Sequence, residues 1–110
     1  RLIKFAVRII KISEKLPNTK AANHIAGQLL RSGTSPAPNH AEARGAESPK
    51  DFIHKLKIAV KELNETEVWL RIIAEAEMIE KSLLLKDLDE CQQLGRMLSA
   101  SIRTVRNKNL

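Results

Sequence analysis

The sequence predicts an all-α protein that folds as an antiparallel, up-down four-helix bundle. Leucine, isoleucine, alanine, lysine, arginine and glutamate dominate its 110 residues, and most of these are good helix formers. Aromatic residues make up only 3% of the chain, with no tyrosine, so little is available to build a sheet. Apolar residues also recur every three or four positions in segments that prolines and capping residues separate. We expect a single domain over residues 1–110, with helices at about 1–16, 19–44, 49–80 and 87–107.

The first predicted helix, residues 1–16, carries more apolar residues than one bundle core needs. The stripe that we expect to face the core consists of Leu2, Phe5, Ala6, Ile9, Ile12 and Leu16. A second stripe lies beside it and consists of Ile3, Val7 and Ile10. Pro17 and Asn18 stop this helix, and the hydroxyl of Thr19 can cap the next one.

The second predicted helix, residues 19–44, must bend near its middle. Its core stripe begins with Ala22, Ile25, Ala26, Leu29 and Leu30 and resumes with Ala37, His40 and Ala41. Gly33, Pro36 and Pro38 lie between these two groups. A proline inside a helix removes a backbone donor and clashes with the preceding turn, at a cost of about 3 kcal/mol. We therefore predict one long helix that bends at the prolines and ends at Gly45.

The third predicted helix has the clearest start. Ser48 can accept a first-turn amide hydrogen, Pro49 suits the first helical position, and Asp51 suits the positive end of the helix dipole. A heptad seam follows and consists of Phe52, Leu56, Ala59, Leu63, Thr66, Leu70 and Ile73. A helix that continues to Glu80 is about 45 Å long and sets the length of the bundle.

The fourth predicted helix begins at a capping box, in which Asp87 replaces serine or threonine and Glu90 is the third residue on. Its seam consists of Leu84, Leu88, Cys91, Gly95, Leu98, Ile102 and Val105. We expect Gly95 on this seam to let two backbones approach closely. Helices joined by short turns pack as antiparallel neighbours, which completes the predicted bundle.

Further apolar residues lie off the seam of the third helix, as they do on the first. One bundle of this size cannot easily bury two faces of two helices, so these residues are candidates for a subunit interface. The candidates are Ile3, Val7, Ile10, Ile53, Val60, Trp69 and Ile72. The alternative is a core stripe that is wider than a strict heptad count allows.

Charge is distributed unevenly along this chain of formal net charge +6. Residues 1–31 hold seven lysines or arginines against Glu14, whereas residues 62–80 hold six glutamates against Arg71. The basic region can attract a polyanion or the acidic region of a second copy. The candidate phosphate contacts are Lys4, Arg8, Lys11, Lys15, Arg31, Lys55, Lys57, Lys61, Arg96, Arg103 and Arg106. With few aromatics to stack on bases, such binding would depend on the nucleic-acid backbone, and the alternative is a solvated charged surface.

The sequence shows no pattern of a catalytic, metal or cofactor site. His24, His40 and His54 lie too far apart to form a helix-borne metal pair, and no glycine-rich loop is present to cradle a phosphate. Cys91, the single cysteine, is typical of a small core residue and favours a reducing, cytoplasmic location. The longest apolar run, residues 83–85, is too short to span a membrane. We expect neither enzyme activity nor a cofactor.

Three segments, residues 28–43, 48–59 and 61–66, resemble the four-helix bundle family encoded in intervening sequences of 23S ribosomal RNA genes. The matching motif residues are Arg31, Ser32, Asn39, Glu42, Ser48, Phe52, Leu63, Glu65 and Thr66. The chain departs from the family pattern at Pro36 and Pro38, which replace a single proline between them, and at Ala43, where glycine is common. The accessory variability determinant of diversity-generating retroelements is similar in fold.

The resemblance implies an up-down bundle that assembles into a homopentamer and offers a basic surface for RNA or DNA. It carries over no catalytic residue. Our first hypothesis is therefore a non-enzymatic, oligomeric protein that associates with RNA or DNA through its basic residues. The alternative is a structural or adaptor protein that binds another protein through its apolar or acidic surface.

Overall fold

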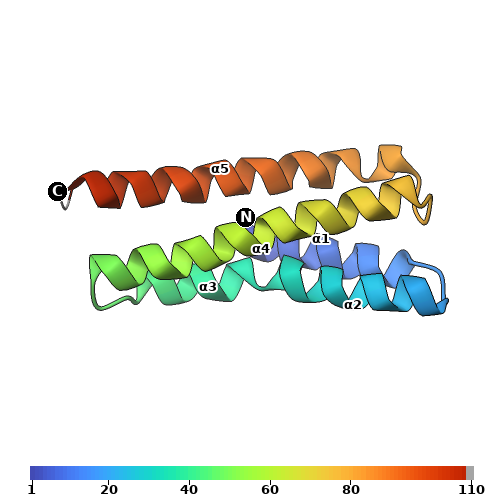
Figure 1. The fold of residues 1–110 in the computed structure, drawn as a ribbon, viewed down its shortest axis with the longest axis horizontal. Coiled ribbons are helices and arrows are strands. Elements are labelled where there is room, and N and C mark those ends of the chain that lie inside the picture. The colour runs from blue at the N-terminus through green and yellow to red at the C-terminus, as the bar shows by residue number, and fades with distance from the viewer. Residues whose placement is uncertain (109–110) are drawn as a thin grey trace.

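The computed structural model describes residues 1–108 and contains only helices and their connections over that range. The helices are α1 (Leu2–Lys15), α2 (Lys20–Thr34), α3 (Pro36–Arg44), α4 (Pro49–Glu75) and α5 (Leu85–Lys108), with a short 3-10 turn at Lys81–Leu83. Figure 1 shows α2 and α3 in line as one bent rod, so the bundle has four rods. They pack α1 on α2, α2 and α3 on α4, and α4 on α5, within 49 × 21 × 19 Å. The structure confirms the predicted four-helix bundle.

The core is formed by the apolar seams of all four rods. Its fully buried large side chains are Phe5, Ile9, Leu29, Leu56, Leu63, Leu70, Ile73, Leu84 and Leu94. Burial of one such side chain contributes about 1.5–3 kcal/mol, so these residues dominate the stability of the bundle. The core stripe predicted for the first helix is correct, because Phe5, Ile9 and Ile12 are all buried.

The second rod bends between α2 and α3, as predicted. Ser35 keeps helical dihedral angles (φ −72°, ψ −36°), and Pro36 occupies the first position of α3. Pro36 and Pro38 supply no amide hydrogen to the helix ladder at this point. Asn39 strengthens the junction, because its backbone N and its side-chain Nδ2 both donate to the Ser35 carbonyl oxygen, at 3.2 and 3.0 Å.

The glycine that allows two helices to approach closely is Gly33, not Gly95. A Cβ atom on Gly33 would lie 2.6 Å from Cγ2 of Ile9, so α1 rests directly on this point of α2. A Cβ atom on Gly95 would meet nothing within 4 Å. The close approach predicted at Gly95 is therefore wrong, because the space beside this glycine is open.

Two predicted helix starts are confirmed, but the predicted end of the third helix is wrong. Thr19 Oγ1 accepts the amide hydrogen of Ala22, and Ser48 Oγ accepts that of Asp51, each at 3.1 Å. α4 stops at Glu75 rather than Glu80.

A left-handed residue, Glu77 with φ 57°, turns the chain away from the α4 axis. The amide of Met78 donates to the Ile73 carbonyl and that of Glu77 to the Ala74 carbonyl, both at 3.1 Å. This pair of bonds is a Schellman motif, which satisfies the last carbonyls of a helix. Met78 then folds back to pack against the core.

The capping box predicted at the start of the fourth helix does not form. α5 already begins at Leu85, and the amide of Leu88 donates to the Leu84 carbonyl at 2.9 Å. The carboxylate of Asp87 instead accepts a hydrogen bond from Arg8 on α1, and that of Glu90 accepts one from Arg1, the residue that precedes α1. They link the two helices rather than closing the end of one.

Candidate nucleic-acid interface

Three of the predicted phosphate contacts are occupied by carboxylates of the protein itself. Arg8 pairs with Asp87, and Lys55 lies 3.8 Å from Glu42. Arg31 pairs with Glu62 at 2.9 Å and also with Glu65. These three cations serve primarily to join helices.

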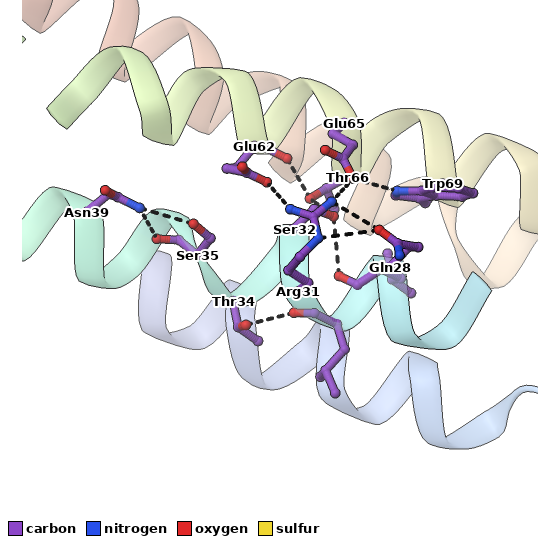
Figure 2. Close-up of polar contacts among 12 residues, drawn as sticks. Gln28, Arg31, Ser32, Thr34, Ser35, Asn39, Glu62, Glu65, Thr66 and Trp69 are labelled. Carbon is purple, nitrogen blue, oxygen red and sulfur yellow. Dashed lines mark hydrogen bonds and ion pairs between the residues drawn. The ribbon is translucent and has the colours of Figure 1, made fainter. Parts of the chain in front are cut away.

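Arg31 is the centre of a polar junction between α2 and α4, which Figure 2 shows. Its guanidinium also donates to Oε1 of Gln28, at 3.2 and 3.3 Å. Oε2 of Glu65 accepts a second bond, 2.9 Å long, from Nε1 of Trp69. The junction therefore holds Trp69 as a structural residue and leaves its indole nitrogen unavailable to a ligand.

The ion pairs between α1 and α5 are the second such junction. The Asp87 carboxylate is only 3% exposed, and its bond to Arg8 raises the pKa of that guanidinium. Arg1 Nη2 lies 2.7 Å from Glu90 Oε1, and this hydrogen bond lowers the pKa of the Glu90 carboxyl. Both effects favour the charged forms, so the link persists at neutral pH.

The other eight predicted cations make no ion pair among residues 1–108. Three of them, Lys4, Lys11 and Lys15, lie on α1. The other five lie on α4 and α5 and are Lys57, Lys61, Arg96, Arg103 and Arg106. All eight side chains are exposed. They are therefore the cations available to an external anion.

Two of the five cations of α4 and α5, Arg96 and Arg103, line one groove between these helices, and the other three lie on the helix faces that border it. The groove has a volume of about 460 Å³, and its wall from α5 includes Gln92, Arg96, Ser99 and Arg103. These residues follow spacings of four, three and four, so they share one face of the helix. On α4, Lys57 and Lys61 share a face with Asn64, another wall residue, by the same spacing.

The two ends of the α4–α5 pair carry opposite charge. Residues 50–61 and 96–108, which lie side by side because the helices are antiparallel, contain eight lysines or arginines and one acidic residue. Residues 62–90 contain nine acidic residues and three lysines or arginines. We call the first set the basic end and the second the acidic end. The basic end includes the groove cations and is the strongest candidate for a polyanion site.

The predicted subunit-interface residues fall into two groups. Ile3 is 73% exposed, and Val7, Ile10 and Ile72 are also exposed. Ile53, Val60 and Trp69 are half-buried against the core, which fits the wider core stripe that the sequence left open. Sequence reasoning missed five other exposed apolar residues, Leu30, Val68, Leu83, Leu85 and Met97. The placement of Leu30 in the core stripe of the second helix was wrong, because this side chain is 39% exposed. Val68 could have been found, because it lies four positions before Ile72 on the same face.

The histidines and the cysteine form no cluster. Among the described residues, no group of three histidine, cysteine or acidic side chains is placed to hold a metal ion. The ring of His24 packs edge-on against Trp69, and burial lowers the pKa of His40. Cys91 donates from Sγ to the Leu63 carbonyl at 3.0 Å, and burial raises the pKa of its thiol to about 12. No helix in residues 1–108 offers an apolar stretch long enough to cross a lipid bilayer.

The fold and the charge pattern define the class: an all-helical bundle with a basic groove. The sequence profile of the 23S rRNA-intervening sequence protein family matches residues 1–100, and the chain belongs to this family. A solved structure of a protein of unknown function from the S23 ribosomal protein family of Bacteroides thetaiotaomicron is 38% identical in sequence. The match covers 92% of this chain and 94% of that one, with a TM-score of 0.86. A search of curated proteins finds no match.

Proposed function

We propose that the protein is a non-enzymatic, cytoplasmic, oligomeric protein that associates with RNA or DNA through the basic end of α4 and α5. One observation carries the proposal. Five exposed cations without an ion pair in the described chain lie on the helix faces that border one groove, and two of them, Arg96 and Arg103, line it. Carboxylates, in contrast, neutralise Arg8, Arg31 and Lys55. The family is named for 23S rRNA, so RNA is the first polyanion to test.

Binding of this kind depends on phosphates rather than on bases. The chain has three aromatic residues, of which Phe5 is buried and Phe52 and Trp69 are half-buried. It therefore presents no exposed aromatic ring on which a base can stack. We expect similar affinity for RNAs of different sequence.

Salt dependence tests the proposal. Neutralisation of about four phosphates predicts that affinity falls about 100-fold between 50 and 200 mM salt. The measurement is fluorescence anisotropy of a labelled RNA of generic sequence. The absence of any binding at 50 mM salt would sink the proposal.

A matched pair of variants tests the location. Arg96→Gln with Arg103→Gln removes two groove cations, and Lys4→Gln with Lys11→Gln removes two exposed cations of α1. Both variants lose two charges, but we expect the first to lower affinity and flatten the salt dependence more than the second. Equal losses would show that net charge, not the groove, attracts the RNA.

A second candidate function, assembly with further copies or with another protein, rests on the exposed apolar residues. Ile3, Val7 and Ile10 form a stripe on the outer face of α1, and exposed lysines flank it. Val68 and Ile72 form a second stripe on α4, within the acidic end. Opposite charges beside two apolar stripes favour contact between copies, and the family resemblance implies five of them. Light scattering at micromolar concentration tests this, and a monomer would contradict it.

A further inference from the structure

Gly95 has no structural reason to be glycine. Glycine is among the least favourable residues in a helix interior, and α5 runs from Leu85 to Lys108. Gly33, the other glycine beside the core, is required because Ile9 fills the space that its side chain would occupy. No atom occupies the corresponding space at Gly95. The missing side chain instead opens the groove between α4 and α5, which Gly95 lines.

The polar groups around this opening suit a phosphate-bearing strand. Arg96 and Arg103 line the groove on the same face of α5, separated by about 10 Å along the helix axis, so they address different phosphates. Neither has an ion-pair partner in residues 1–108. The amides of Asn64 and Gln92 and the hydroxyl of Ser99 can bond to sugar or phosphate oxygens.

One carboxylate, that of Glu67, also lines the groove. It lies 3.2 Å from the guanidinium of Arg71, one turn further along α4. This pairing offsets its charge, and Glu67 marks the end of the groove that faces the acidic end of the bundle. A bound polyanion therefore extends from Gly95 towards Arg103 and away from Glu67.

We propose that the sugar–phosphate backbone of a polynucleotide lies in this groove directly over Gly95, with Arg96 and Arg103 contacting two different phosphates as the strand continues towards Arg103. The inference rests on the proposed association with RNA or DNA and specifies where the strand lies. The open Cβ position of Gly95 lets the strand approach the α5 backbone, and any side chain there occupies the space of the strand. The bases face outward, because the groove wall has no aromatic residue.

The experiment compares Gly95→Gln with Gly27→Gln. Gly27 is a matched control, because it lies inside α2, away from the groove, and a Cβ atom there also meets nothing within 4 Å. Glutamine adds no charge and favours helix more than glycine does, so both variants should unfold at higher urea concentration than the wild type. The binding probe is a labelled single-stranded RNA at 50 mM salt.

We expect Gly95→Gln to weaken RNA binding about tenfold and Gly27→Gln to leave it unchanged. Unchanged binding by Gly95→Gln, with the Arg96 and Arg103 double variant impaired, would overturn the groove inference and leave the proposed function standing. Equal loss in both glycine variants would also overturn the groove inference. Absence of binding by the wild type would overturn both proposals. Inorganic phosphate at millimolar concentration should not displace the RNA, and displacement would show a site for a free anion instead.

Discussion

Glu77 carries the least common backbone conformation of the described chain, and this position yields a stability prediction. Its φ of 57° lies in the left-handed region, where a side chain is crowded against the following carbonyl. Glu77→Gly should therefore raise the free energy of unfolding by about 0.5–1 kcal/mol, as measured by urea denaturation. Glu75→Gly, the control on the last residue of α4, should lower it, because glycine weakens a helix. A loss of stability in Glu77→Gly would contradict this interpretation of the turn.

Cys91 provides a prediction about reactivity and pH. Burial raises the pKa of its thiol from 9.0 to about 12, so on the order of 1000-fold less thiolate is present in the folded protein at pH 8. Alkylation by iodoacetamide should be slower by a similar factor in native protein than in urea. The raised pKa also makes the free energy of unfolding depend on pH. The contribution of the neutral Cys91 thiol to that free energy is fully present below pH 9 and is lost as the pH rises towards 12. Equal alkylation rates in native protein and in urea would contradict the first prediction, because they would show that the Cys91 thiol is accessible in the folded protein.

At the scale of the helices, a hydroxyl pair joins α2 to α4 inside the bundle. Thr66 Oγ1 lies 2.9 Å from Ser32 Oγ, and both residues are fully buried. Thr66→Val keeps the shape but leaves the Ser32 hydroxyl short of a partner, so we expect a loss of about 1–3 kcal/mol in urea denaturation. The double variant with Ser32→Ala should lose less than the two single variants together. Additive losses would show that the hydroxyls do not interact.

Helix starts and core seams could be predicted from the sequence because they depend on neighbouring residues. Ser48 and Thr19 cap helices through amides three positions away, and Phe5 and Ile9 share a face through the helical repeat alone. The bend at Pro36 is equally local, because a proline acts on its own turn. Such features need no knowledge of the tertiary structure.

Features that depend on distant residues could not be predicted. Asp87 looked like a cap, but α1 brings Arg8 to it across 79 positions of sequence. Arg31 looked like a phosphate contact until α4 supplied two carboxylates. The stop of α4 had no sequence signal, because a glutamate rather than a glycine takes the left-handed position. The open space at Gly95 likewise depends on how α4 lies beside α5.

At the scale of the whole molecule, the two apolar stripes lie on opposite sides of the bundle. α1 contacts α2 and α5 as its neighbours, and α4 contacts the same two rods, so α1 and α4 occupy diagonal corners. Val7 lies two positions from the core residues Phe5 and Ile9, which turns it about 200° away from them. Val68 likewise lies two positions from the buried residues Thr66 and Leu70, so it also points away from the core. Two different surfaces on opposite sides favour head-to-tail contact and a closed ring over a two-fold dimer.

A mixing experiment distinguishes these two kinds of contact. One variant, Ile3→Asp with Val7→Asp, loses the α1 stripe, and the other, Val68→Asp with Ile72→Asp, loses the α4 stripe. In head-to-tail assembly neither variant should associate alone, because each lacks one of the two complementary surfaces. An equimolar mixture should form a heterodimer through the two intact stripes and stop there, because the remaining surfaces carry the substitutions. Light scattering of each variant and of the mixture gives the masses, and circular dichroism checks that both remain helical. If one variant forms a dimer alone, the contact joins identical surfaces and the head-to-tail arrangement is wrong.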